Sequence, residues 1–140
     1  MILAIATGAF ATSIGTSNSA TGFYTTAIGT YNLSEGHFST TIGLADTAYS
    51  YAETVLGMFN TSYTANNTSS FDSDDRLLVV GNGFDFDNRS DALIIYKSGN
   101  TELNGALTLN NAFTFATIDG DGGQLLTTDG SATVFWSDVN

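Results

Sequence analysis

The sequence contains no cysteine and no proline, and it has few basic residues. The lack of cysteine excludes a disulfide framework and any thiolate metal site, and the lack of proline excludes polyproline and collagen-like segments. Three basic residues (Arg76, Arg89 and Lys97) stand against 14 acidic ones, so the formal charge at pH 7 is −11. Binding to nucleic acid needs clustered Lys and Arg, and an anionic membrane surface would repel this chain. We therefore expect no nucleic-acid partner.

Long apolar runs are also missing. No run approaches the roughly 20 residues of a membrane-spanning helix, and the N-terminus lacks the positive region of a signal peptide. We expect no membrane insertion within this chain, and any secretion signal or anchor outside it. Thr, Gly, Ser and Asn supply 62 of the 140 residues, which disfavours helix, while ten Phe and six Tyr supply more apolar surface than a disordered chain carries. The composition therefore predicts an all-β protein.

A fourteen-residue repeat organises the first half of the chain. Its four copies align without a gap: TGAFATSIGTSNSA (7–20), TGFYTTAIGTYNLS (21–34), EGHFSTTIGLADTA (35–48) and YSYAETVLGMFNTS (49–62). The sixth, eighth and ninth columns hold Thr, Ile or Leu, and Gly, respectively. These residues are Thr12, Thr26, Thr40 and Thr54; Ile14, Ile28, Ile42 and Leu56; and Gly15, Gly29, Gly43 and Gly57. Glycine falls at every seventh position except at Ser50, and such a frequency is incompatible with a coiled coil, because each glycine costs about 1 kcal/mol in a helix.

Each copy instead predicts one coil of a β-solenoid. Columns four, six and eight alternate as in a strand, and the glycine that follows, with the Asn or Asp of column twelve, is expected to form turns at positive φ. A coil this narrow has room only for small interior side chains such as Ala, Ser, Thr and Gly. We therefore expect the Ile/Leu column to face outward and to be covered by a partner chain. A monomeric solenoid with this column inside is the alternative.

The repeat resembles the YadA-like head repeats of trimeric autotransporter adhesins over residues 4–62. Residues 25–29 (TTAIG) and 40–43 (TTIG) match the small-x-Ala-Ile-Gly core of that family best, and 12–15 (TSIG) and 54–57 (TVLG) match it less closely. The resemblance implies a left-handed parallel β-roll, a homotrimer around one axis and an extracellular attachment role. The stalk and anchor of that family have no counterpart in this chain. Because the chain begins inside a coil with no cap, we expect Met1 to begin a fragment or to follow another fibre segment.

The second half predicts smaller β units after a polar linker. We divide the chain into the β-roll (1–62), a linker (63–75), a β-rich connector (76–111) and a C-terminal β-hairpin unit (112–140). Strands are expected at 76–81, 92–97, 106–109, 113–117, 124–127 and 133–136. Residues 75–100 resemble the segment that follows such heads in bacterial and phage fibres, and residues 112–136 are similar to a short β unit of tail-fibre-type proteins.

Two local predictions concern the side chains of this half. Arg76 is expected to pair with Asp74 or Asp75, and Arg89 with Asp87 or Asp91. Trp136 is expected to anchor an apolar cluster. The other members of that cluster are Phe113, Phe115, Leu125 and Phe135.

Catalytic chemistry has little support in the sequence, and we expect neither an enzyme nor a cofactor or metal site. The sole histidine, His37, lies in a column shared with Ala9, Phe23 and Tyr51, whose variability predicts a surface position. Asp-rich segments at 72–75, 85–88 and 119–122 offer oxygen ligands for calcium, but none has EF-hand spacing, and turn formation explains them more simply. Phe23, His37 and Tyr51 remain as candidates for binding a ligand at the surface.

The sequence thus predicts a structural and adhesive segment of an extracellular homotrimeric fibre. Its receptor would be a glycan or a protein on a host surface, and the fibre would belong to a bacterial surface adhesin. A tail fibre or receptor-binding fibre of a phage or contractile injection system is the alternative. A third interpretation is an ice-binding solenoid, since the threonine file can order water. The flanking columns are apolar, however, and favour an interior or interchain position for that file.

Overall fold

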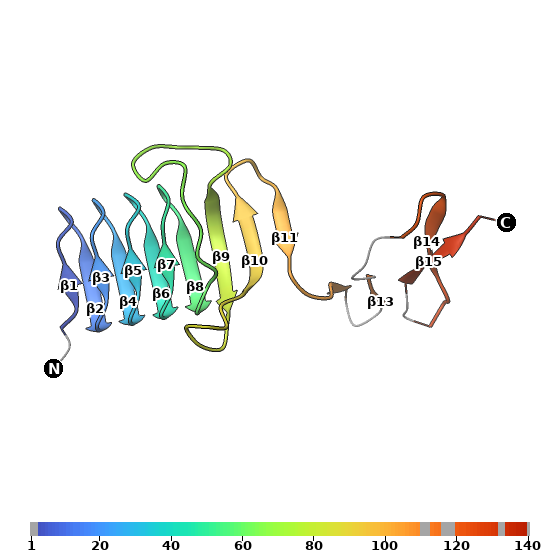
Figure 1. The fold of residues 1–140 in the computed structure, drawn as a ribbon, viewed down its shortest axis with the longest axis horizontal. Helices are drawn as coiled ribbons and strands as arrows, with labels where there is room; N and C mark the ends of the chain where they lie inside the picture. The colour runs from blue at the N-terminus through green and yellow to red at the C-terminus, as the bar shows by residue number, and fades with distance from the viewer. Residues whose placement is uncertain (1–2, 110–112, 116–119, 132–133, 140) are drawn as a thin grey trace. The chain divides into compact units, whose positions relative to one another are not determined.

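The computed structural model describes residues 3–109, 113–115, 120–131 and 134–139, and these residues form strands and turns without any helix. Two compact units are present, residues 1–102 and residues 103–140. The first unit contains the repeat and is drawn in blue to yellow in Figure 1. The expectation of an all-β protein is therefore confirmed for the described part of the chain.

The repeat forms a parallel β-solenoid with two strands per coil. The longer strands are β2 (Thr12–Thr16), β4 (Thr26–Thr30), β6 (Thr40–Leu44) and β8 (Thr54–Met58), and the shorter ones are β1 (Ile5–Ala6), β3 (Ser19–Ala20), β5 (Leu33–Ser34) and β7 (Thr47–Ala48). Each of the strands β1 to β6 pairs in parallel with the strand fourteen residues further on, so that Thr12 lies beside Thr26 and Ile14 beside Ile28. The predicted fourteen-residue coil is confirmed. Figure 1 shows the coils stacked side by side.

Three further strands extend the sheet of the longer strands. After β8 the chain leaves the stack, arches over it and returns as β9 (Arg76–Asn82), which is parallel to β8 (Figure 1). β10 (Asp91–Tyr96) is antiparallel to β9, and β11 (Thr101–Leu103) completes the sheet. The resulting large sheet has seven strands, and the small sheet, β1-β3-β5-β7, has four.

The residues that form the two corners of each coil differ from those predicted. At eight non-glycine residues φ lies between 48° and 60°, in the left-handed region that L-residues seldom adopt. These residues are Phe10, Tyr24, Phe38 and Ala52 at the first corner, and Ser17, Tyr31, Ala45 and Phe59 at the second. The prediction that the Asn or Asp of column twelve adopts positive φ is wrong, because the residue before it does so. The column-twelve side chain lies at the same corner but inside the coil, where Nδ2 of Asn18 donates to the carbonyl of Ile14 at 2.7 Å.

The column-nine glycines lie within the long strands rather than in the turns. At Gly29 φ is 121°, and a Cβ there would come 2.0 Å from the carbonyl oxygen of Gly43 in the next coil. The glycines at the first corner are also needed for close approach, since a Cβ on Gly36 would lie 1.9 Å from the carbonyl oxygen of Ser50. Ser50 belongs to the last coil, where its hydroxyl donates to the carbonyl of Arg76 at 2.9 Å. The interruption of the glycine spacing therefore marks the end of the stack.

Small side chains fill the interior between the two sheets, as predicted. Ala20, Ala27 and Thr41 are fully buried, and the hydroxyls of Ser34 and Thr41 meet at 2.8 Å across the coil. At the end of the stack the core becomes larger and more apolar. Its buried members there are Ala48, Val55, Val79 and Ile94.

The second unit consists of two antiparallel strand pairs. β12 (Thr108–Leu109) pairs with β13 (Phe113–Thr114), and β14 (Gln124–Thr128) pairs with β15 (Val134–Asp138). Leu125 is 57% exposed and Phe135 is 41% exposed, so the apolar cluster predicted around Trp136 is not enclosed. The Trp136 ring lies against Gly120. The side chain of Phe113, another expected member, lies outside the described residues.

Candidate interaction surface

The outer face of the large sheet carries a continuous row of aliphatic side chains. The strand register aligns one outward residue from each of six strands, and we call this set the aliphatic row. Its members are Ile14, Ile28, Ile42, Leu56, Val80 and Leu93. Ile14 is 55% exposed, Ile42 42% and Leu56 37%. The expected outward direction of the Ile/Leu column is confirmed, and the alternative of an inward column is wrong.

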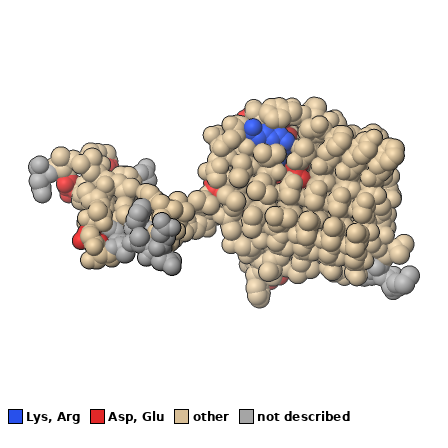
Figure 2. Space-filling view, turned by 180° about the vertical axis from the view of Figure 1, so that it is seen from behind, with Lys and Arg blue, Asp and Glu red and all other residues tan. Residues whose placement is uncertain are grey.

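Two further rows on the same face border the aliphatic row. The threonine file (Thr12, Thr26, Thr40 and Thr54) runs along one side and continues into Leu78 and Ile95. On the other side lie Thr16, Thr30, Leu44, Met58 and Asn82. An interior position for the threonine file is thus excluded. None of these three rows contains a charged residue. On the side of the molecule seen in Figure 2, most of the solenoid surface is uncharged, and Lys and Arg atoms gather in one place.

The candidate binding residues Phe23, His37 and Tyr51 lie at the first corner within a larger group of rings. The rings of Phe23 and His37 stack at 4.6 Å between centroids. In the neighbouring column, Tyr24 stacks on Phe10 at 4.8 Å and on Phe38 at 5.0 Å, and Tyr51 packs edge-on against Phe38. We call these six residues the aromatic edge. Column four was assigned to a strand from the sequence, so the surface position of Phe10, Tyr24 and Phe38 was missed, although their fourteen-residue spacing indicates a stack.

Stacking determines what the aromatic edge offers to a ligand. Rings that lie parallel, with interplanar angles of 11° and 10° along the Phe10–Tyr24–Phe38 file, cover each other's faces. A sugar ring that packs on an aromatic side chain needs an open face. Tyr24 therefore has both ring faces covered, whereas Phe10 at the end of the file is 77% exposed and has only one face against another ring.

The aspartates of the loops act as turn acceptors. Asp72 accepts the amide of Asp74 at 3.0 Å, and Asp85 accepts the amides of Asp87 and Asn88. The hydrogen bond from the Asn88 side chain lowers the pKa of Asp85. In the described part of the chain, no group of three or more His, Cys, Asp or Glu side chains is arranged to hold a metal ion.

The column-twelve side chains form a buried ladder along the inside of the second corner. The side-chain nitrogen Nδ2 of Asn32 donates to the carbonyls of Ile28 (2.7 Å) and Gly43 (2.8 Å), and its side-chain oxygen Oδ1 accepts the backbone amide of Asp46. Asp46 accepts the amide of Asn60 through Oδ1, but its Oδ2 has no partner. Burial raises the pKa of Asp46 from 3.8 to about 6.

A second buried carboxylate, Glu53, closes the last coil. In earlier coils, the amides of Glu35 and Gly36 donate to the carbonyl of Ala48 in the following coil. The equivalent amides of Tyr49 and Ser50 have no following coil, and Oε2 of Glu53 accepts both at 2.8 Å. The same oxygen accepts the Tyr63 hydroxyl at 2.9 Å. Burial raises the pKa of Glu53.

The ion pair of Arg76 differs from the one predicted, and Arg89 and Lys97 both bind backbone carbonyls. Arg76 pairs with Asp91 at 3.4 Å rather than with Asp74 or Asp75, and its guanidinium lies 4.3 Å above the Tyr63 ring. Arg89 donates to the carbonyls of Ala45 and Asn60, both at 3.0 Å. Arg89 and Lys97 thus fasten the segments after β8 to the solenoid, since Lys97 donates to Ser50 and to the carbonyl of Arg76. Arg76 instead links β9 to β10 and to Thr61.

Comparison of the chain with protein-family models, with curated proteins and with solved structures gave no match. Among the described residues there is no helix that is long and apolar enough to span a membrane. What the chain does must therefore be inferred from its own surfaces.

Proposed function

We propose that this chain is a segment of an extracellular homotrimeric fibre that serves attachment and spacing. The observation that carries the proposal is the aliphatic row, which crosses six strands of the large sheet and in a single chain has three exposed and three half-buried members. Rows of this kind on a soluble protein mark association surfaces. The number of three chains, and the role as a bacterial adhesin head, come from the resemblance of the repeat to YadA-like heads.

The energetics favour association through many coils rather than through one. Burying the exposed half of an Ile or Leu side chain contributes about 1 kcal/mol. Association loses about 4–15 kcal/mol of translational and rotational freedom. A single coil cannot offset this loss, but a row that crosses six strands in every chain can. A fibre of a phage or contractile injection system would use the same surface in the same way.

The oligomeric state tests this proposal directly. We expect native mass spectrometry and analytical ultracentrifugation of the full chain to give a trimer at micromolar concentration. The variant Ile42→Asp places a carboxylate in the aliphatic row and should give monomers. Thr21→Asp adds the same charge at an exposed position beyond the end of β3, outside the large sheet, and should leave the trimer intact. A wild-type monomer, or equal effects of the two substitutions, would refute the proposal.

The outward direction of the threonine file favours one other candidate, an ice-binding face. Thr26, Ile28 and Thr30 lie in register with the equivalent residues of β2 and form a regular outward array. In β6 and β8 the last position of this array holds Leu44 and Met58, which interrupts the pattern. A thermal-hysteresis assay separates the two functions, and we expect no activity at concentrations where established ice-binding proteins are active.

A further inference from the structure

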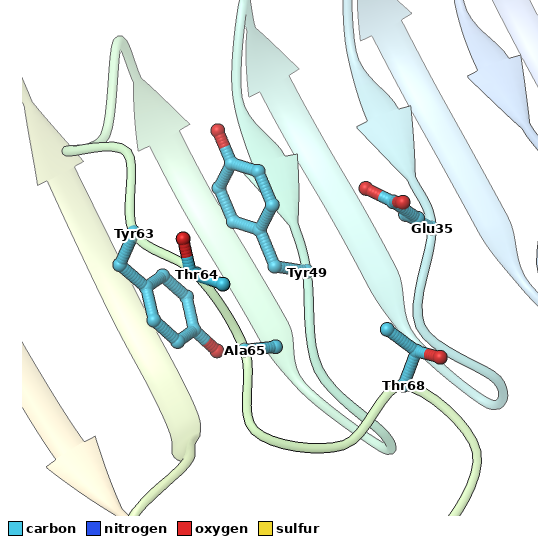
Figure 3. Close-up of a pocket in the computed structure, with 6 residues that line it drawn as sticks. All are labelled: Glu35, Tyr49, Tyr63, Thr64, Ala65 and Thr68. Atoms are coloured by element: carbon cyan, nitrogen blue, oxygen red, sulfur yellow. The ribbon is translucent and has the colours of Figure 1, made fainter.

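The loop between β8 and β9 passes beside the segments that follow β5 and β7 of the small sheet and forms a pocket there. The loop is attached by its backbone, since the amide of His37 donates to the carbonyl of Thr68 at 2.7 Å and that of Tyr51 to the carbonyl of Asn67 at 3.1 Å. The pocket has a volume of about 280 Å³. Figure 3 shows its six lining residues, Glu35, Tyr49, Tyr63, Thr64, Ala65 and Thr68.

The repeat changes its chemistry at the position where the loop covers it. The first column holds Thr7 and Thr21 in the first two coils, and then Glu35 and Tyr49 in the last two. Glu35 and Tyr49 extend from neighbouring coils on the same face, as Figure 3 shows. An acid and an aromatic residue thus replace threonine only in the two coils that line the pocket.

The two tyrosine rings of the pocket are arranged differently from those of the aromatic edge. Tyr49 and Tyr63 meet edge to face, with centroids 5.2 Å apart and an interplanar angle of 76°. In this arrangement one ring covers only one face of the other. The Arg76 guanidinium covers a second face, on Tyr63. Two of the four ring faces are therefore not covered by these contacts.

The polar groups of the pocket are positioned to receive hydroxyl groups. Glu35 is exposed, and among the described residues its carboxylate has no hydrogen-bond or ion-pair partner. Thr64 and Thr68 add exposed hydroxyls from the loop. The Tyr63 hydroxyl is held by its bond to the buried Glu53, which fixes the ring that forms one wall. An aromatic wall, a free carboxylate and several hydroxyls meet in one small pocket.

We propose that this pocket binds one pyranose ring of a neutral saccharide. The apolar C–H face of the sugar packs on a tyrosine face that these two contacts leave uncovered, and the Glu35 carboxylate accepts hydrogen bonds from two neighbouring sugar hydroxyls. The volume lies near the lower end of the range of about 300–1,000 Å³ for ligand sites, which suits a single ring. An acidic sugar is disfavoured by Glu35 and by the net charge of −11, and a cation cannot pack on the face of Tyr63 that the Arg76 guanidinium already covers.

The saccharide site deepens the proposed attachment role and rests on it for its biological meaning, but it is built from one chain. The small sheet lies across the coil from the aliphatic row, since the interior side chains Ser34 and Thr41 of the two sheets face each other. Association through the aliphatic row therefore leaves the pocket open. Saccharide binding can fail while the chain is trimeric, and it can occur in a monomer, so the two proposals fail separately.

The test is a titration of the isotope-labelled full chain with saccharides, followed by NMR. The probes are the methyl glycosides of glucose, galactose, mannose and N-acetylglucosamine, with sialic acid and tetramethylammonium as charged competitors. We expect at least one neutral glycoside to bind with a Kd on the order of 1 mM, and to shift the amide signals of Glu35, Tyr49 and Thr68. No binding by any neutral glycoside, or tighter binding of either charged probe, would overturn the proposal.

Three variants locate the binding. Tyr49→Ala removes the aromatic wall and should weaken binding by about tenfold or more. Glu35→Gln keeps the shape of the side chain and should weaken binding by about fivefold. Tyr31→Ala removes an exposed tyrosine that lies outside the pocket, and it should bind as the wild type does. The Glu35→Gln result is decisive if Tyr49→Ala fails to fold, and unchanged binding in that variant places the ligand elsewhere.

Discussion

Replacing Asp46 by asparagine should stabilise the protein at neutral pH, because Asp46 occupies a position in the ladder of column-twelve side chains where the neighbouring coils have an asparagine amide. A Cβ built on the column-nine glycine serves as a common reference point in each coil. In the two preceding coils this point lies 3.1 Å from Nδ2 of Asn18 and 2.9 Å from Nδ2 of Asn32. In the next coil the Cβ built on Gly43 lies 2.7 Å from Oδ2 of Asp46, so this oxygen occupies the place of the asparagine nitrogen. The Asn32 nitrogen donates to two carbonyls from this place. An ionised Asp46 presents an acceptor where the fold requires a donor.

The magnitude follows from the change in pKa on folding. Burial raises the pKa of Asp46 from 3.8 to about 6, and a rise of about two units corresponds to about 3 kcal/mol. Because the carboxyl group is neutral in the folded state below this pKa, its favourable contribution is complete below about pH 4 and is lost as the pH rises through 6. With allowance for residual solvent screening, we expect Asp46→Asn to be more stable than the wild type by about 1.5–3 kcal/mol at pH 8, and nearly equal to it at pH 4.

Urea unfolding, followed by circular dichroism at one protein concentration between pH 4 and pH 8, measures this difference. The other acidic groups are common to both proteins, so they cancel in the comparison. The reverse substitution, Asn32→Asp, is the matched control and should destabilise the protein more at pH 8 than at pH 4. A stability gap between Asp46→Asn and the wild type that does not change with pH, or a loss of stability in Asp46→Asn at pH 8, would show that Asp46 is not in the environment described above.

Two other substitutions test the packing and the end of the stack by the same unfolding measurement. Gly36→Ala forces a Cβ against the Ser50 carbonyl and should lower the free energy of unfolding by about 2 kcal/mol or more. Ser50→Ala removes only a hydroxyl and should lower it by about 1 kcal/mol. Similar losses in the two variants would contradict the close approach of the coils. Glu53→Ala leaves two buried amides without an acceptor and should cost about 2–4 kcal/mol, while Ser39→Ala in the same column removes a hydroxyl that has no partner and should be nearly neutral. A stable Glu53→Ala protein would mean that these amides find another acceptor.

The periodic part of the fold could be predicted because every coil repeats the same contacts. Fourteen-residue spacing fixed the register, and the need for small residues inside a narrow coil placed Ile28 and its equivalents outside. The corners could not be predicted from residue preferences, since Tyr24 and Phe38 adopt a left-handed backbone that glycine or asparagine usually takes. The rings of Tyr24 and Phe38 stack between neighbouring coils at 5.0 Å, and this contact offsets part of the backbone strain. The conformational preference of a single residue does not include contacts with the next coil.

Interactions that occur once in the molecule were predicted poorly. Arg76 was assigned to acids adjacent in sequence, but it pairs with Asp91, which the β9–β10 connection brings beside it. The path of the loop beside the small sheet leaves no pattern in a polar segment, so the pocket was missed. The presence of Glu35 and Tyr49 in a column that otherwise holds threonine was the available signal in the sequence. It indicates a pocket only when the position of the loop beside these two residues is known.

The departures from the repeat are as informative as its matches, because a solenoid must end. A coil in the middle of the stack uses the following coil for its hydrogen bonds and leaves no room for a side chain in the second column, which Gly22 and Gly36 occupy. The last coil has no following coil to accept its hydrogen bonds or to block a side chain in the second column. Ser50 can therefore replace glycine there, and Glu53 supplies the acceptor that a carbonyl of the next coil would otherwise supply. A buried carboxylate is costly in a stack of identical coils, but at the terminal coil it satisfies two amides and holds Tyr63, the residue that begins the wall of the pocket. The end of the repeat and the proposed saccharide site therefore depend on the same side chain.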